Sequence, residues 1–177
     1  MLPKLTLVLG GAASGKSSWA EDLIVPAYQN PVYLATAQAW DAEMQAKIDR
    51  HRSARGDVWD TVEAPLDLAP ALAAAQQDQA VLLDCATLWL TNHLLAEHDL
   101  VAQTRNLLEA LAACRAPVVV VSNEVGSGIV PDNALSRRFR QAQGELNQRL
   151  AARAGLVVAV MAGLPLVLKG TIPGASA

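Results

Sequence analysis

Residues 5–17 read LTLVLGGAASGKS, and this stretch decides the fold of the chain. The first five residues are apolar except for one threonine, which is typical of a buried strand. Residues 10–17 then fit the phosphate-loop pattern G-x-x-x-x-G-K-[ST] and lead directly into an amphipathic stretch. A strand, a glycine-rich loop and a helix in this order direct backbone N–H groups at a phosphate. A glycine-rich turn without a ligand is the alternative, but the strand, the lysine and the serine together favour a nucleotide site.

Two side chains of this loop have specific roles in nucleotide binding. We expect Lys16 to reach the β and γ oxygens of a triphosphate and the Ser17 hydroxyl to bind Mg²⁺. The pattern predicts a nucleoside triphosphate site, although it does not identify the reaction.

The rest of the chain alternates short apolar runs with longer amphipathic stretches. Most of the short runs are apolar at nearly every position, which indicates strands of a parallel sheet that is covered on both faces. We expect strands at residues 4–9, 31–35, 80–84, 117–122, 156–161 and 164–168, and helices at 16–25, 41–55, 66–77, 87–97, 101–114 and 133–154. This order predicts an α/β P-loop fold with a mostly parallel central sheet and helices on both faces. A single domain over residues 1–169 and a flexible tail at 170–177 are expected.

The composition excludes several classes of protein. Hydrophobic residues make up 52% of the 177 residues and charged residues 18%, which excludes a disordered chain. The formal net charge of −3 provides no basic field for nucleic acid. The uncharged stretch 154–168 is short and contains glycine and proline, so no membrane span is expected. Cys85 and Cys114 lack a CxxC partner and are expected as buried thiols of a cytoplasmic protein without a signal peptide.

An acidic residue that assists Mg²⁺ is expected at the end of a neighbouring strand. Residues 80–84 read AVLLD, so Asp84 is the candidate, binding the ion directly or through water. An aspartate that only caps the following helix is the alternative. The guanine-reading pattern N-K-x-D is absent, because residues 123–126 read NEVG. This argues against a signalling GTPase but leaves GTP open as a substrate.

Residues 41–55 read DAEMQAKIDRHRSAR and predict a helix with a basic ridge of Lys47, His51 and Arg55 at i, i+4 and i+8. Neighbouring cations disfavour the charged imidazolium, so His51 is expected to be neutral and nucleophilic. Attack by such a ring on a phosphate would give a phosphoramidate intermediate. The alternative is a solvated charged face. His93 and His98 lack a comparable ridge, and we assign them no role.

Several segments together resemble one family, the bifunctional adenosylcobinamide kinase and adenosylcobinamide-phosphate guanylyltransferase of cobalamin biosynthesis. The resemblance covers about residues 5–169. Its carriers are GGAASGKS at 10–17, YLATAQAWDAEM at 33–44, KIDRHRSAR at 47–55, TVEAP at 61–65, LLDCATLWLTN at 82–92, VSNEVGSGIVP at 121–131 and RFRQAQGELNQRLA at 138–151.

The resemblance implies two reactions. A nucleoside triphosphate, ATP or GTP, phosphorylates adenosylcobinamide, and GTP then transfers GMP to the product through a covalent histidine adduct, with release of pyrophosphate. The implied catalytic residues are His51 and Lys16, the Mg²⁺ ligands are Ser17 and Asp84, and the assembly is a homotrimer. The implied nucleotide-binding residues are Gly10, Gly11, Ala12, Ala13, Ser14, Gly15, Lys16, Ser17, Ala35, Thr36, Ala37, Arg52, Ser53, Ala54, Arg55, Glu63 and Asp84.

The chain departs from the family pattern at three positions. Ala13 stands where an arginine is usual, Asp84 where related chains often have glutamate, and Arg50 where some members have a second histidine. The first change weakens one phosphate contact, and the second shortens a carboxylate by one methylene.

Downstream of the strand at 117–122, Glu124 is a candidate base for the kinase step, with a purely structural turn as the alternative. Arg137, Arg138 and Arg140 are expected either to meet acidic ligand groups or to be solvated.

Two other functions fit parts of the pattern. A small-molecule kinase without a covalent intermediate needs only the phosphate loop and an acid. A nucleotide-responsive interaction protein, in which GTP only orders a surface, needs the loop alone.

Overall fold

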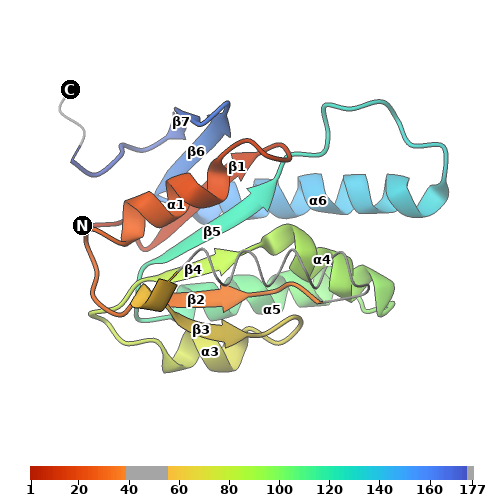
Figure 1. Ribbon diagram of the computed structural model, residues 1–177. Helices are drawn as coiled ribbons and strands as arrows, with labels where there is room; N and C mark the ends of the chain where they lie inside the picture. The colour runs from red at the N-terminus through yellow and green to blue at the C-terminus, as the bar shows by residue number, and fades with distance from the viewer. Residues whose placement is uncertain (39–55, 175–177) are drawn as a thin grey trace.

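The computed structural model describes residues 1–38 and 56–174 (Figure 1). In this part of the chain, seven strands form one sheet in the order β3-β2-β4-β5-β1-β6-β7. All neighbouring strands are parallel except β6 and β7, which form an antiparallel hairpin. The strands are β1 Leu5–Gly10, β2 Val32–Ala35, β3 Asp60–Glu63, β4 Val81–Asp84, β5 Val118–Asn123, β6 Leu156–Met161 and β7 Leu164–Lys169. The predicted α/β fold with a mostly parallel sheet is therefore confirmed.

The described helices cover the sheet on both faces (Figure 1). Helix α1 packs on one face, and α3, α4, α5 and α6 pack on the other. The helices are α1 Lys16–Ile24, α3 Ala69–Ala74, α4 Ala86–Leu95, α5 Leu100–Ala113 and α6 Ala134–Arg153, with a short 3₁₀ turn η1 at Gly56–Val58.

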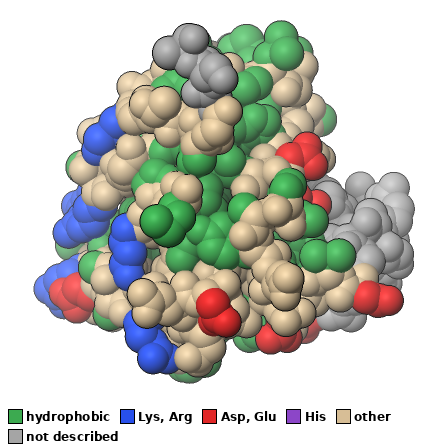
Figure 2. Space-filling model, turned by 90° about the vertical axis from the view of Figure 1, so that its left-hand side faces the viewer, with side chains coloured by type: hydrophobic (Ala, Val, Ile, Leu, Met, Phe, Trp, Pro, Cys, Tyr) green, Lys and Arg blue, Asp and Glu red, His purple; other side chains and the backbone are tan. Residues whose placement is uncertain are grey.

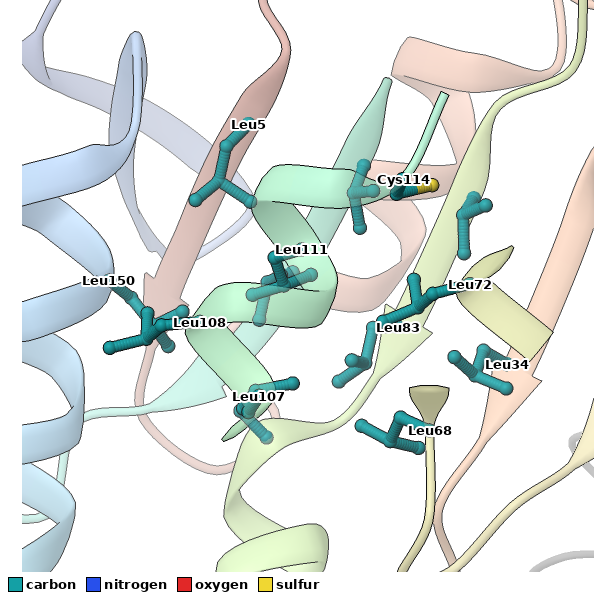
Figure 3. Close-up of a cluster of buried hydrophobic side chains, with 14 of the residues drawn as sticks. Leu5, Leu34, Leu68, Leu72, Leu83, Leu107, Leu108, Leu111, Cys114 and Leu150 are labelled. Carbon is teal, nitrogen blue, oxygen red and sulfur yellow. The ribbon is translucent and has the colours of Figure 1, made fainter. Parts of the chain in front are cut away.

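Strand β4 shows why the central strands are apolar at successive positions. Leu82 packs in the α1 layer and Leu83 in the layer of α3, α4, α5 and α6, and both are fully buried. Figure 3 shows the second layer, where Leu83 lies among side chains of α5 such as Leu107 and Leu111. Burial of each such leucine side chain contributes about 1.5–3 kcal/mol, so both layers stabilise the sheet.

Strand β3 was not expected from the sequence. Its residues DTVE are exposed except for the partly buried Val62, so they lack the apolar run by which the other strands were recognised. The strand forms because its backbone pairs with β2 at the edge of the sheet.

The remaining expectations have mixed outcomes. The helix expected at 66–77 extends only over Ala69–Ala74, and Leu68 precedes it as its N-cap without a side-chain cap. The expected helix at 41–55 lies outside the described residues. Cys85 and Cys114 are both free and buried, as expected. Among the described residues, no helix combines the length and apolarity needed to cross a bilayer.

Candidate nucleotide site

The loop between β1 and α1 has the conformation that its glycines require. Gly15 adopts a left-handed conformation with φ of 89°, and a methyl group there would lie 3.1 Å from Gly163 Cα. A methyl group at Gly10 would lie well inside contact distance of Ser14 Oγ and 2.7 Å from the carbonyl oxygen of Val160. Both positions therefore need glycine, because L side chains are strained at positive φ or meet backbone atoms.

The turn between β6 and β7 hydrogen-bonds to this loop. The Gly163 amide donates a hydrogen bond to the Ser14 carbonyl at 2.8 Å. Lys16 Nζ donates to the Gly11 carbonyl at 3.0 Å, so its ammonium group lies over the loop. Ser14 Oγ is buried and has no hydrogen-bond partner among the described residues. An unpartnered buried hydroxyl inside a loop of this shape fits a site that receives hydrogen-bonding phosphate oxygens.

Asp84 is the last residue of β4, so it lies at the carboxyl ends of the parallel strands, as does the phosphate loop. It lies opposite Val121 on β5, and Gly10 lies opposite Asn123 on the other side of β5. The expected acid is therefore not on a strand adjacent to β1, because β5 separates the two. Two strand spacings separate β4 from β1 by about 10 Å, and Gly10 lies two residues beyond Val8, the β1 residue level with Asp84, which leaves room for phosphate groups and a hydrated ion.

The protein groups at this edge fit a magnesium ion that is bound mainly by a nucleotide. Ser17 supplies a hydroxyl and Asp84 a half-buried carboxylate, and Mg²⁺ prefers oxygen ligands of this kind together with phosphates and water. In residues 1–38 and 56–174, no group of three or more acidic, cysteine or histidine side chains could hold a metal.

Cys85, the residue after Asp84, is not suited to nucleophilic chemistry. Burial, with the Asp84 carboxylate as a smaller cause, raises its pKa to about 11. A thiol with this pKa stays protonated at neutral pH, and the thiolate is the nucleophilic form.

Thr36 holds strand ends together instead of facing a ligand. Its hydroxyl accepts a hydrogen bond from the Cys85 amide and donates one to the Cys85 carbonyl, both at 2.8 Å. The Asn92 side chain on α4 donates to the carbonyls of Thr36 and Pro65, at 2.8 and 2.9 Å. Thr36 is 0% exposed and its hydroxyl is already paired with the Cys85 backbone, so its expected contact with the nucleotide stays a prediction. Asn92 joins the segments that follow β2 and β3, a role that no feature of the sequence predicted.

The register of the sheet brings other expected site residues together. Ala35 at the end of β2 lies opposite Glu63 on β3 and Asp84 on β4. These three residues lie at the carboxyl ends of their strands, where the phosphate loop also lies, and Ala37 is two residues after Ala35. The structure thus unites residues from four parts of the sequence. The remaining expected residues are outside the described part of the chain, and they are His51, Arg52, Ser53, Ala54 and Arg55.

Comparison with known proteins identifies this arrangement. The family model described as "Cobinamide kinase / cobinamide phosphate guanyltransferase" matches residues 6–168. The chain belongs to this family. Its members combine a kinase and a nucleotidyltransferase activity.

Three curated relatives of the cobinamide kinase family are similar over most of their length. The "Bifunctional adenosylcobalamin biosynthesis protein CobP" of Pseudomonas aeruginosa is 45% identical, covering 93% of this chain and 96% of the relative. The CobU proteins of Escherichia coli K12 and Salmonella typhimurium, named in the same way, are 40% and 42% identical and are each covered over 99%.

Solved structures with little sequence similarity share the fold of this cobinamide kinase family member. A type III secretion system ATPase is 10% identical, with a TM-score of 0.55, covering 94% of this chain and 57% of that chain. A protein from Pyrococcus horikoshii OT3 is 8% identical, with a TM-score of 0.52, covering 96% of this chain and 88% of that chain. These likenesses support the P-loop fold.

The segment that follows β5 and begins at Glu124 adjoins the phosphate loop. The Glu124 amide donates to the Gly10 carbonyl at 3.1 Å. The Glu124 carboxylate accepts hydrogen bonds from the amides of Gly126 and Ser127, at 2.5 and 3.3 Å. Hydrogen bonding, above all from the Ser127 side chain, lowers the pKa of Glu124. A lower pKa makes a weaker base, so the geometry favours the structural role of Glu124 over the base for the kinase step.

Two of the three arginines of α6 also shape this segment. Arg137 donates to the carbonyls of Pro131 and Asp132, at 3.0 and 2.7 Å. Arg140 donates to the Gly126 carbonyl at 2.5 Å. Arg138 is exposed. Arg137 and Arg140 therefore stabilise loop backbone, an outcome that neither of the two expected roles anticipated.

Proposed function

We propose that this chain phosphorylates adenosylcobinamide with ATP or GTP and then transfers GMP from GTP to adenosylcobinamide phosphate. The products of the second step are adenosyl-GDP-cobinamide and pyrophosphate. The observation that carries the proposal is a complete phosphate loop, with Asp84 at the same sheet edge, in a chain whose family match spans residues 6–168.

In the kinase step, the acceptor hydroxyl oxygen attacks the γ-phosphorus, and the bond from that phosphorus to the bridging oxygen breaks. The hydroxyl proton passes to water, and a nucleoside diphosphate leaves. Lys16 stabilises the charge that develops on the phosphate oxygens, and the loop amides orient the triphosphate. When bound, Mg²⁺ held by Ser17 and Asp84 would neutralise charge between the phosphates.

In the guanylyltransferase step, we propose that a ring nitrogen of His51 attacks the α-phosphorus of GTP. The bond from the α-phosphorus to the α–β bridging oxygen breaks, pyrophosphate leaves, and GMP is joined to the histidine. A phosphate oxygen of the corrinoid then attacks the same phosphorus and releases the imidazole. Support comes from the basic spacing around His51 and from the nucleotidyltransferase activity in the family description.

The covalent step can be tested with GTP labelled at its α-phosphate. We expect acid-labile, alkali-stable label on the denatured wild-type protein and none on His51→Ala. Lys16→Ala should also lose the label, because the triphosphate would lose a counter-charge. His98→Asn is the matched histidine control and should label normally, because His98 hydrogen-bonds to His93 and is not among the expected nucleotide-binding residues. Equal labelling of wild type and His51→Ala would refute the assignment, and transfer of γ-phosphate alone would favour a kinase without a covalent intermediate.

We also propose that nucleotide contacts extend from residues 10–17 to the ends of β2, β3 and β4. Ala35, Thr36, Ala37, Glu63 and Asp84 are the described candidates, and residues 52–55 are the further ones. Their support is the shared sheet edge set by the strand register.

We propose a homotrimer in the cytoplasm. The two buried free thiols are consistent with a reducing compartment. For self-association, the support is β7, an edge strand at which Leu164 and Leu166 are 71% and 63% exposed. Hydrophobic side chains gather on the upper part of the face in Figure 2, where β6 and β7 lie in Figure 1. Contiguous exposed apolar side chains on a sheet edge are typical of protein interfaces.

The oligomer can be tested by light scattering after gel filtration. We expect a trimer for the wild type and a smaller species for Leu166→Lys. Val101→Lys is the control, since Val101 is equally exposed but lies on α5. A wild-type monomer would refute the proposal.

A further inference from the structure

Tyr33 on β2 contacts Asp84, a candidate ligand of the metal ion. Tyr33 lies in the middle of β2, directly opposite Leu82 on β4, and Asp84 is two residues further along β4. Across this diagonal, the Tyr33 hydroxyl donates a hydrogen bond to Asp84 Oδ2. Tyrosine is long enough to bridge such a diagonal from one strand to the next.

The position of this hydroxyl is set by the packing of the ring. Tyr33 is 2% exposed and belongs to the layer that packs against α1. Its ring meets the ring of Trp59 edge to face, with the centroids 5.5 Å apart and the planes at 87°. A buried aromatic ring held in this way has little rotational freedom, so its hydroxyl is a fixed donor.

This fixed donor restricts the Asp84 carboxylate. Asp84 is half-buried at the end of its strand, and Oδ2 is held by the tyrosine. Hydrogen bonds from a neutral donor to a carboxylate are strong and short, and outer partners of this type orient the groups that hold a metal. With Oδ2 held, the carboxylate keeps one orientation, and Oδ1 is the oxygen available to a metal or to its water.

We propose that Tyr33 is a positioning residue that orients the Asp84 carboxylate toward the metal ion of the bound nucleotide. This inference rests on the proposed role of Asp84. In this proposal Tyr33 acts through Asp84 and not through a contact of its own with the nucleotide. It acts by keeping the carboxylate in place before the nucleotide arrives.

The test compares nucleotide affinity with and without a metal. The probe is the α,β-methylene analogue of GTP, which resists attack at the α-phosphorus, and its affinity is measured by calorimetry in Mn²⁺ and in EDTA. The ratio of the two affinities reports the metal contribution alone. We expect Tyr33→Phe to reduce this ratio by about tenfold, the lower end of the range for outer partners of metal ligands, with little change in EDTA.

Three comparisons make the test specific. Tyr28→Phe is the matched control, because Tyr28 is the chain's other tyrosine and packs on the same layer, and it should leave the ratio unchanged. Asp84→Asn should reduce the ratio at least as much as Tyr33→Phe. In the Asp84→Asn background, Tyr33→Phe should have little further effect, because the two residues act through one contact. Near-ultraviolet circular dichroism, to which the four tryptophans contribute, shows whether the aromatic packing is kept.

The outcomes separate the inference from the function on which it rests. If Asp84→Asn lowers the ratio while Tyr33→Phe does not, the inference is overturned and the role of Asp84 stands. If Asp84→Asn has no effect, the proposed role of Asp84 is wrong and the inference falls with it. If the two substitutions reduce the ratio additively, Tyr33 acts by another route and the inference is likewise overturned. If Tyr33→Phe alters the ring packing, Trp59→Phe is the reference, because it perturbs the same ring contact and keeps the tyrosine hydroxyl, and the ratio must then fall further in Tyr33→Phe than in Trp59→Phe.

Discussion

Substituting Gly10 by alanine should destabilise the protein even when no nucleotide is present. The added methyl group would meet Ser14 Oγ inside contact distance and lie 2.7 Å from the Val160 carbonyl oxygen. The serine hydroxyl can rotate, but the carbonyl belongs to β6, which pairs with β1, so the backbone must move. Forced overpacking of this kind costs about 1–3 kcal/mol. The reduced entropy of the unfolded chain returns about 0.4–1 kcal/mol, so a net loss is expected.

The neighbouring glycine provides the control. A methyl group at Gly11 would meet nothing within 4 Å, and Gly11 does not have a positive φ. Gly11→Ala should therefore be neutral or slightly stabilising in the protein without nucleotide. For a chain of this size, 1 kcal/mol corresponds to about 2–4 °C in Tm. Gly10→Ala is then expected to lower Tm by several degrees in a thermal unfolding scan, while Gly11→Ala is not.

A double substitution identifies which contact matters. Combining Gly10→Ala with Ser14→Ala removes the contact to the hydroxyl but keeps the one to the Val160 carbonyl, so Tm should recover only in part. If Gly10→Ala has the Tm of the wild type, or if both glycine variants lose the same stability, the steric reasoning is refuted.

Three further predictions concern the core, the loop after β5 and the thiols. Leu72→Ala on α3 removes a fully buried side chain and should lower the free energy of unfolding by about 2–5 kcal/mol, as measured by urea denaturation; a loss below 1 kcal/mol would contradict the packing. The pKa of Glu124 is lowered from its ordinary value of 4.5, so its charged carboxylate stabilises the fold above pH 4.5. The free energy of unfolding of the wild type should exceed that of Glu124→Gln by less and less as the pH falls below 4.5. A constant difference across that range would refute the shift. Cys85 and Cys114 are buried and their pKa values are raised, so iodoacetamide at pH 8 should modify neither thiol in the native protein and both after denaturation. Mass spectrometry of the intact protein measures the modification. Rapid labelling of Cys85 in the native protein would contradict its pKa of about 11.

The phosphate loop could be predicted from the sequence because its chemistry is local. Consecutive backbone amides of residues 10–17 form the loop, and two of its glycines, Gly10 and Gly15, stand where the backbone turns sharply or approaches another segment. The central strands could be predicted for a similar reason, since burial on both faces makes each of them apolar throughout. Even so, the partner that requires glycine at position 10 is Val160, a residue far along the chain, and no local pattern shows it.

The candidate site was predicted less completely. The pairing of the Thr36 hydroxyl with the Cys85 backbone was not predicted, because it depends on β2 and β4 lying side by side. Asn92 looked like an ordinary helical residue until the fold placed it against the carbonyls of Thr36 and Pro65. Such roles depend on which strands are neighbours, and strand order is not encoded in any short segment.

By itself, the sequence determined that this chain binds a nucleotide on a P-loop, that its sheet is mostly parallel, and that it resembles a cobinamide kinase and guanylyltransferase. These features follow from hydrophobic periodicity and from a motif whose atoms are contiguous in the chain. Only the tertiary structure decided that β5 separates β4 from β1, that the polar segment 60–63 forms an edge strand, and that Tyr33 holds Asp84. The physical reason is that these features are contacts between residues distant in sequence, which exist only once the sheet has assembled in one particular order.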